Sequence, residues 1–196
     1  MKFFLFFLVL NFSIGAFAQD AYMDSLRTFR ENYIQKHEVV LGKDRSNMTF
    51  YPIGKNYQVV AHFKKAENSQ WLSFPTSGKI NKVYKVYGTL SFMLNGQTLQ
   101  LHVYQSQDLL KREEYRNYLF LPFTDATNAD ETYEGGRYMD LTTADIQNNT
   151  VLLDFNKAYN PYCAYVSGKY NCPIPPKENA LPIALQAGEK AYRDSH

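Results

Sequence analysis

Three carboxylates and one arginine in the C-terminal half of the chain have the residue types that acid–base chemistry needs. Asp140 and Asp154 lie in two predicted strands, Glu189 lies near the C-terminus, and an arginine is found at position 137. Two carboxylates held close together make one of them harder to ionise, which suits a general acid or base. The three carboxylates are therefore candidate catalytic residues, and Arg137 is a candidate for binding an anionic group.

The predicted strands indicate to which face of the sheet the Asp140 and Asp154 side chains point. In an extended chain, alternate side chains point to opposite faces of the sheet. Residues 137–141 and 151–155 form successive predicted strands, and the Asn-Asn dipeptide at 148–149 favours a turn between them. In such a hairpin, Asp140 and Asp154 could project from the same side of the sheet.

Further polar side chains would line such a site as binding residues beside Arg137. They are Tyr138, Asn156, Tyr159 and Asn160. A purely structural alternative fits the same residues. Asp154 and Asn156 could instead bond backbone amides at the turn, as such side chains often do. Arg137 would then neutralise Asp140.

The two cysteines, Cys163 and Cys172, predict a disulfide. A bond between them would close a short loop, and the export that residues 1–18 predict would bring the chain into an oxidising compartment. A metal site would need two further ligands, which the neighbouring sequence does not supply. A redox-active pair would more usually read Cys-x-x-Cys.

Other catalytic and cofactor motifs are absent from the sequence. There is no glycine-rich phosphate loop and no Gly-x-Ser-x-Gly turn. His37-Glu38 begins like a zinc-protease helix, but Leu41 stands where the second histidine is required. We therefore predict no metal and no cofactor. The net charge of +2, with lysine and arginine scattered along the chain, gives no indication of nucleic-acid binding.

Residues 1–18 have the three parts of a secretory signal peptide. Residues 1–2 are positively charged, residues 3–12 are almost entirely apolar, and Ala-Phe-Ala at 16–18 matches a signal-peptidase site. The apolar stretch is shorter than the roughly 20 residues that a membrane span needs. We predict cleavage after Ala18 and an exported protein, periplasmic or secreted, with no membrane span after cleavage. An uncleaved N-terminal anchor is the alternative.

Hydrophobic periodicity predicts a helix followed by strands. Apolar side chains recur three and four positions apart from Asp20 to about His37, which indicates an amphipathic helix. We expect it to pack onto the domain, and a partner-binding helix is the alternative. The best-defined strands form a hairpin around Asn95-Gly96, a favoured two-residue turn. If Leu94 pairs with Gln97, the alternation of apolar residues fits the same register.

That register predicts the remaining pairs of the hairpin. On the apolar face they are Phe92 with Leu99, Leu90 with Leu101, and Gly88 with Val103. On the other face they include Thr89 with His102 and Tyr87 with Tyr104.

The other predicted strands are residues 57–63, 71–74, 118–121, 137–141 and 151–155. Residues 118–121 are apolar on both faces, which indicates a central strand that ends at Pro122. Together these elements predict an all-β fold, an antiparallel β-sandwich or barrel with an N-terminal amphipathic helix. We expect residues 19–196 to form a single β-rich domain.

Much of the chain resembles a known family. The runs at 119–127, 131–141, 154–165, 172–179 and 187–190, with Phe-Tyr-Pro-Ile at 50–53, are similar to the bacterial domain of unknown function 1684 family. The family domain would span about residues 45–192. Where the family usually has a third glycine before Arg-Tyr, this chain has Glu134. The resemblance implies an identity but no activity.

Two functions from different classes fit the sequence. The first is a non-catalytic exported envelope protein whose β-domain binds a small ligand or another envelope protein. The absence of an activated nucleophile and of a metal cluster, with the near-neutral charge, favours this reading. The second is a carboxylate-based hydrolase or related acid–base enzyme with a site around Arg137, Asp140 and Asp154. The sequence leaves open whether the protein is an enzyme.

Overall fold

The computed structural model describes residues 11–193. Contacts divide the chain into two compact units, residues 1–36 and 37–196, which are described separately. The first unit contains α1 (Asn11–Gln35), which confirms the predicted N-terminal helix. Among the described helices, none has both the length and the hydropathy of a membrane span. Residues 1–10 of the predicted signal peptide lie outside the described part of the chain.

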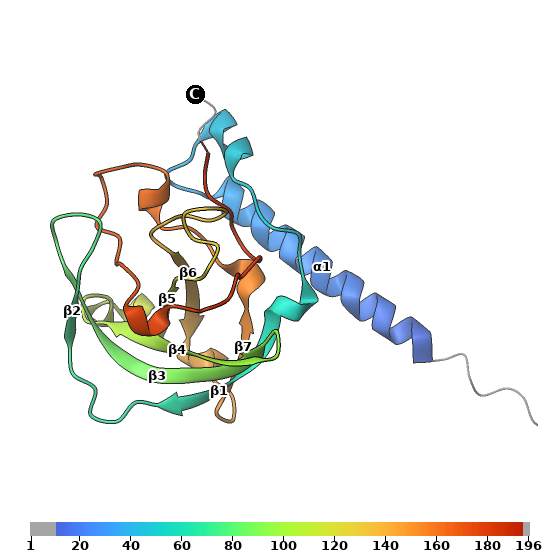
Figure 1. Cartoon of the computed structure of the whole chain (residues 1–196), viewed down its shortest axis with the longest axis horizontal. Coiled ribbons are helices and arrows are strands. Elements are labelled where there is room, and N and C mark those ends of the chain that lie inside the picture. The colour runs from blue at the N-terminus through green and yellow to red at the C-terminus, as the bar shows by residue number, and fades with distance from the viewer. Residues whose placement is uncertain (1–10, 194–196) are drawn as a thin grey trace, which may run out of the picture. The chain divides into compact units, whose positions relative to one another are not determined.

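The second unit is built on one seven-stranded sheet, whose strands run in the order β6-β5-β4-β3-β1-β7, with β2 added beside β3. All the strand pairs are antiparallel. The sheet curls into a half-barrel (Figure 1), which confirms the predicted all-β fold. The strands are β1 (Gln58–Lys65), β2 (Leu72–Phe74), β3 (Lys82–Leu94), β4 (Gln97–Ser106), β5 (Tyr118–Phe123), β6 (Arg137–Thr142) and β7 (Thr150–Asp154).

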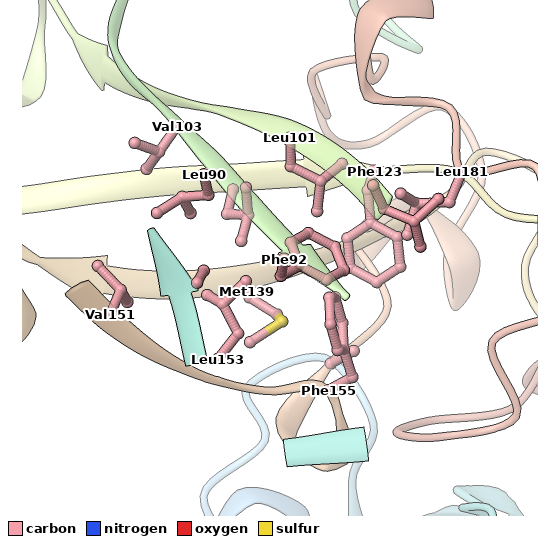
Figure 2. Close-up of a cluster of buried hydrophobic side chains, with 14 of the residues drawn as sticks. Leu90, Phe92, Leu101, Val103, Phe123, Met139, Val151, Leu153, Phe155 and Leu181 are labelled. Atoms are coloured by element: carbon pink, nitrogen blue, oxygen red, sulfur yellow. The ribbon is translucent and has the colours of Figure 1, made fainter. Parts of the chain in front are cut away.

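The inner face of the sheet carries the main core. Every strand except β2 contributes buried apolar side chains to it, and the C-terminal segment 181–187 packs across this face. Figure 2 shows Phe92, Phe123 and Phe155 meeting at one end of the core. Burial of apolar surface is the main driving force for folding, so this segment is part of what closes the half-barrel.

The opposite, outer face carries a second cluster. We call it the outer aromatic cluster, and its buried members are Phe74, Tyr84, Tyr104, Phe120 and Tyr138. Neighbouring rings meet edge to face, tilted or stacked, with centroids 4.7 to 5.3 Å apart. Several tyrosines of this tyrosine-rich sequence thus lie in a cluster, where a ring can be buried while its hydroxyl reaches a polar neighbour.

The β3–β4 hairpin has the predicted register, with one exception. Leu94 pairs with Gln97, and the pairing continues without a shift to Gly88 and Val103. Beyond this point the ladder shifts, so that Tyr104 pairs with Val86 and the predicted Tyr87–Tyr104 pair is wrong. A glycine suits the position beside this bulge, because a Cβ atom at Gly88 would lie only 2.2 Å from the ring of Phe63.

Strand β5 lies between β4 and β6 and is covered on both faces, as predicted. Its predicted end at Pro122 is wrong, since the strand continues to Phe123. The carbonyl of Pro122 accepts a hydrogen bond from the Asn179 side chain at 2.6 Å, on the side away from β6. The proline nitrogen faces the same side, so no ladder hydrogen bond to β6 is lost.

The predicted hairpin between β6 and β7 is wrong. These strands lie at opposite ends of the strand order, where β6 pairs with β5 and β7 pairs with β1. A short 3-10 helix (Thr143–Asp145) follows β6 and carries a capping box between Thr142 and Asp145. This cap stops the strand and turns the chain away, so the Asn-Asn turn at 148–149 leads into pairing with β1.

Cys163 and Cys172 form the predicted disulfide. The bond closes a loop that is tied to the segment before β3, because Ser77 donates its amide to the carbonyl of Cys172 at 3.0 Å. The neighbouring Pro173 also forms an isolated bridge with Thr76. The disulfide therefore fixes a loop whose flank lies against the outer face of the sheet.

Replacing both cysteines by serine should lower the free energy of unfolding by about 2–3 kcal/mol, because the short cross-linked loop no longer restrains the unfolded chain. The measurement is chemical denaturation of the wild-type and double-variant proteins under non-reducing conditions. Alkylation of the native wild-type protein without prior reduction should leave both cysteines unmodified. Two labelled thiols in that experiment would contradict the assignment.

Candidate functional site

Arg137 lies on the inner face of β6 and is fully buried. Its guanidinium donates to Asp125 at 2.7 Å and to the carbonyls of Leu185 at 2.9 Å and Glu189 at 3.3 Å. It also donates to the carbonyl of Ala187. The side chain expected to bind an anionic group is thus engaged by the chain itself, and it neutralises Asp125 rather than Asp140.

Asp125, which was not among the candidates, is the other half of this buried ion pair. One carboxylate oxygen accepts from the Thr127 amide at 2.9 Å, the Thr127 hydroxyl at 2.6 Å and the Leu185 amide at 3.1 Å. The Asp-Ala-Thr sequence after a buried strand is a signal that could have indicated this turn. Asp125 and Arg137 together join β6, the turn after β5 and the C-terminal segment.

Glu189 and Asn160 lie beside this ion pair and are also fully buried. The Glu189 carboxylate accepts from the Asn160 amide at 2.9 Å and from the Tyr165 hydroxyl at 2.6 Å. Asn160 in turn donates its side-chain amide to the carbonyl of Lys190 at 2.8 Å. Arg137, Asn160 and Glu189 are therefore brought together, but as a buried network that holds the loops in place.

Asp154 and Asn156 form a separate structural group at the end of β7. Asp154 accepts from the backbone and side-chain amides of Asn156 at 3.1 and 2.9 Å, which caps the short helix that follows. Asn156 then makes two hydrogen bonds with the backbone of Gly54, at 3.0 and 2.8 Å. This is the turn-capping role that the sequence offered as the structural alternative.

Asp140 is the candidate that remains exposed, on the outer face of β6. Its Oδ1 atom accepts hydrogen bonds from the hydroxyls of Tyr118 and Tyr159, both at 2.7 Å. Because β6 and β7 are at opposite edges of the sheet, Asp140 and Asp154 do not form the expected carboxylate pair. We call Asp140, Tyr118 and Tyr159 the Asp140 cluster.

The outer aromatic cluster packs against the Asp140 cluster through Tyr138. Tyr138 contacts the Phe120 ring at 4.7 Å and the Tyr159 ring at 6.0 Å, and its hydroxyl donates to the carbonyl of Pro173 at 2.5 Å. Tyr138 and Tyr159 also exchange two backbone hydrogen bonds, at 2.9 and 3.0 Å. The Tyr159 ring is thus positioned by an extended segment that pairs with β6.

The surroundings of Tyr118 in the Asp140 cluster keep its phenol protonated. Burial raises the pKa of Tyr118, and the adjacent Asp140 carboxylate raises that pKa further. Burial also raises the pKa of Tyr138. Tyr118 therefore acts as a hydrogen-bond donor over the physiological pH range, and its proton points at Asp140.

The second carboxylate oxygen of Asp140, Oδ2, has no hydrogen-bond partner among the described residues. None of the described lysine, arginine or histidine side chains forms a salt bridge with it. No group of three or more metal-ligating side chains occurs in the described part of the chain. The arrangement therefore offers a fixed, exposed anionic acceptor beside aromatic rings.

His37 is a further buried titratable group, near the disulfide loop. Its ring meets those of Tyr162 and Tyr165 edge to face, with centroids 5.5 and 4.6 Å apart. Its Nδ1 atom accepts from the Val40 amide at 2.9 Å, so this nitrogen carries no proton. Burial lowers the pKa of His37, with a smaller lowering from Arg45 that outweighs the opposite effect of Glu38.

Lowering the pH below about 6.5 should therefore reduce the stability of the protein through His37. Its folded-state pKa lies below the unfolded value, so the unfolded chain takes up the proton first and gains stability as the pH falls. The measurement is the free energy of unfolding across this pH range for the wild type and His37→Asn. Asparagine can still accept from Val40 but does not titrate, so the variant should show a flatter pH dependence. An identical pH dependence in the two proteins would contradict the prediction.

The domain is a curved antiparallel sheet closed by its own C-terminal segment. It has a buried Arg137–Asp125 pair inside and an exposed carboxylate held by tyrosines outside. The chain belongs to the family described as "Protein of unknown function (DUF1684)", which matches residues 44–190. This confirms the family that the sequence runs indicated.

A solved structure shows a similar fold. It is the solution NMR structure of the uncharacterized protein from gene locus rrnAC0354 of Haloarcula marismortui. The TM-score is 0.65 at 28% sequence identity, and the match covers 88% of this chain and 96% of that chain. No curated protein matches this sequence.

Proposed function

We propose that this chain is an exported, non-catalytic protein that binds a small ligand through the Asp140 cluster. One observation supports this most directly: Asp140 is an exposed carboxylate whose Oδ1 is held by two tyrosine hydroxyls while its Oδ2 has no described partner. A binding group that is already fixed loses little conformational entropy when a ligand arrives. The other candidate carboxylates, Asp154 and Glu189, are buried and bonded to the chain itself.

A fragment screen on the full chain, with ¹³C-labelled tyrosine observed by NMR, tests the site. Bound fragments should shift the ring signals of Tyr118 and Tyr159, and the shifts should be lost in Asp140→Asn. Fragments that bind only elsewhere would contradict the proposal. One such place is the shallow depression lined by Val60, Met93 and His62 on the outer surface of β1 and β3. A screen without any fragment at Tyr118 and Tyr159 would contradict it equally.

The export part of the proposal rests on the charge and apolar pattern of residues 1–18, and the disulfide is compatible with it. Protein recovered from the producing cells should begin at Gln19, which would leave the later part of α1 as the new N-terminal segment. Mass spectrometry of the intact protein and of its N-terminal peptide measures this. A mature protein that still carries Phe17 would support the anchor alternative instead.

A further inference from the structure

We infer that the ligand group recognised by the Asp140 cluster is a protonated amine. This inference rests on the proposed function and names the chemical class of its ligand. A carboxylate accepts hydrogen bonds at both oxygens, and a protonated amine is a compact cation with several N–H donors.

Oδ1 of Asp140 is held by its neighbours in the cluster. It already accepts from the hydroxyls of Tyr118 and Tyr159, both at 2.7 Å. These two donors hold the carboxylate in one orientation and leave Oδ2 available on an exposed residue. A ligand is therefore met by an acceptor that bears negative charge, and charge-assisted hydrogen bonds are roughly twice as strong as neutral ones.

The Asp140 cluster does not suit an anionic ligand. An anionic ligand would need hydrogen-bond donors or a cation, yet both phenol protons in the cluster point at Asp140. Tyr118 does not ionise at physiological pH, because its pKa is raised, so its hydroxyl continues to donate to Asp140. No described basic side chain is within salt-bridge distance of Asp140. The local charge is therefore negative, which attracts a cation and repels a carboxylate or phosphate.

The Asp140 cluster suits a protonated amine better than it suits other cations. A metal ion would require further oxygen ligands, and no such group of acidic side chains is present among the described residues. A quaternary ammonium ion has no N–H group to donate to Oδ2. Nearby, the guanidinium of Arg112 lies 4.6 Å from the Tyr115 ring, and Tyr115 in turn contacts Tyr118. The rim of the cluster is thus already an aromatic surface compatible with a cationic group.

The experiment compares four probes of similar size on the full chain: butylammonium, tetramethylammonium, butanol and butyrate. Tyrosine signals are followed by NMR during each titration. Butylammonium should shift Tyr118 and Tyr159 and should bind at least about tenfold more weakly to Asp140→Asn, since a hydrogen bond to a charged group is lost. Tetramethylammonium should bind more weakly than butylammonium, and butanol and butyrate should leave these signals unchanged. Raising the ionic strength should weaken amine binding.

Two variants serve as controls. Glu67→Gln removes the same charge from an exposed residue in the turn after β1, and it should leave amine binding unchanged. Tyr159→Phe keeps the Asp140 charge but removes one donor from Oδ1, so it should weaken amine binding less than Asp140→Asn does. If Asp140→Asn does not fold, the salt dependence and the comparison of probes on the wild type still decide the question.

The possible failures are distinguishable. If butanol or butyrate shifts Tyr118 and Tyr159 as strongly as butylammonium does, the amine inference is overturned while binding at the Asp140 cluster stands. If neither the four probes nor any fragment shifts these two residues, the amine inference and the proposed function both fail.

Discussion

Replacing Arg137 by methionine should lower the free energy of unfolding by about 3–5 kcal/mol, because removal of one partner leaves the buried charge of Asp125 uncompensated. The guanidinium also serves the carbonyls of Leu185, Ala187 and Glu189, which would lose their donor. Both side chains of the ion pair are completely buried. The measurement is chemical denaturation monitored by tyrosine fluorescence and circular dichroism.

Two comparisons make this result specific to the buried pair. Arg116→Met removes an arginine from an exposed pair with Glu113 and should leave the unfolding midpoint unchanged. Adding Asp125→Leu to Arg137→Met should restore part of the lost stability, since no unpaired charge then remains. A stability loss for Arg137→Met no larger than that for Arg116→Met would contradict the structural role.

The sequence predicted those parts of the fold that depend on neighbours along the chain. The Asn95-Gly96 turn has positive φ at both residues, as its type requires, and its chemistry and the apolar alternation selected the observed register from Leu94 to Gly88. The register failed only beyond Gly88, where the ring of Phe63 from another strand occupies the space beside the backbone. That contact joins distant residues, so hairpin patterning carried no information about it.

The same limit explains the outcome for the candidate site. Alternation correctly placed Tyr138 and Asp140 on the face opposite Arg137. The partner of β7 could not be predicted, because β7 pairs with β1 through contacts such as Leu153 with Val59, far apart in the sequence. Two adjacent predicted strands look like a hairpin by local signals alone. The Asp140 cluster likewise depends on Tyr118 reaching β6 from β5, which is a tertiary contact.

The C-terminal segment shows how a short sequence run can serve several parts of the fold. The Ala187 carbonyl accepts from Arg137, the Gly188 carbonyl accepts from the Tyr51 amide at 3.0 Å, and the Glu189 amide donates to Ala158 at 2.8 Å. Three successive residues thus bind β6, the segment before β1 and the turn after β7. The buried network requires this run to lie close to other backbone segments, and a glycine in its middle permits that.

Gly188→Ala should therefore lower the free energy of unfolding by about 3 kcal/mol, from left-handed backbone strain of about 1–2 kcal/mol and overpacking of about 1–3 kcal/mol. Gly188 has a φ angle of +77°. A Cβ atom there would lie 2.6 Å from the carbonyl oxygen of Ala158 and 2.9 Å from that of Phe155. These are backbone atoms of the turn after β7, so they cannot move aside as a flexible side chain could.

Gly96→Ala provides the matched control for this prediction. Gly96 has nearly the same φ angle, +76°, but no atom lies within 4 Å of the Cβ position. Alanine at this position therefore meets the backbone strain without the overpacking. Chemical denaturation of both variants should show a larger loss for Gly188→Ala, and the difference measures the contact with the Ala158 and Phe155 carbonyls. Equal losses would mean that the C-terminal run can move away from the turn, and that its close packing contributes little to stability.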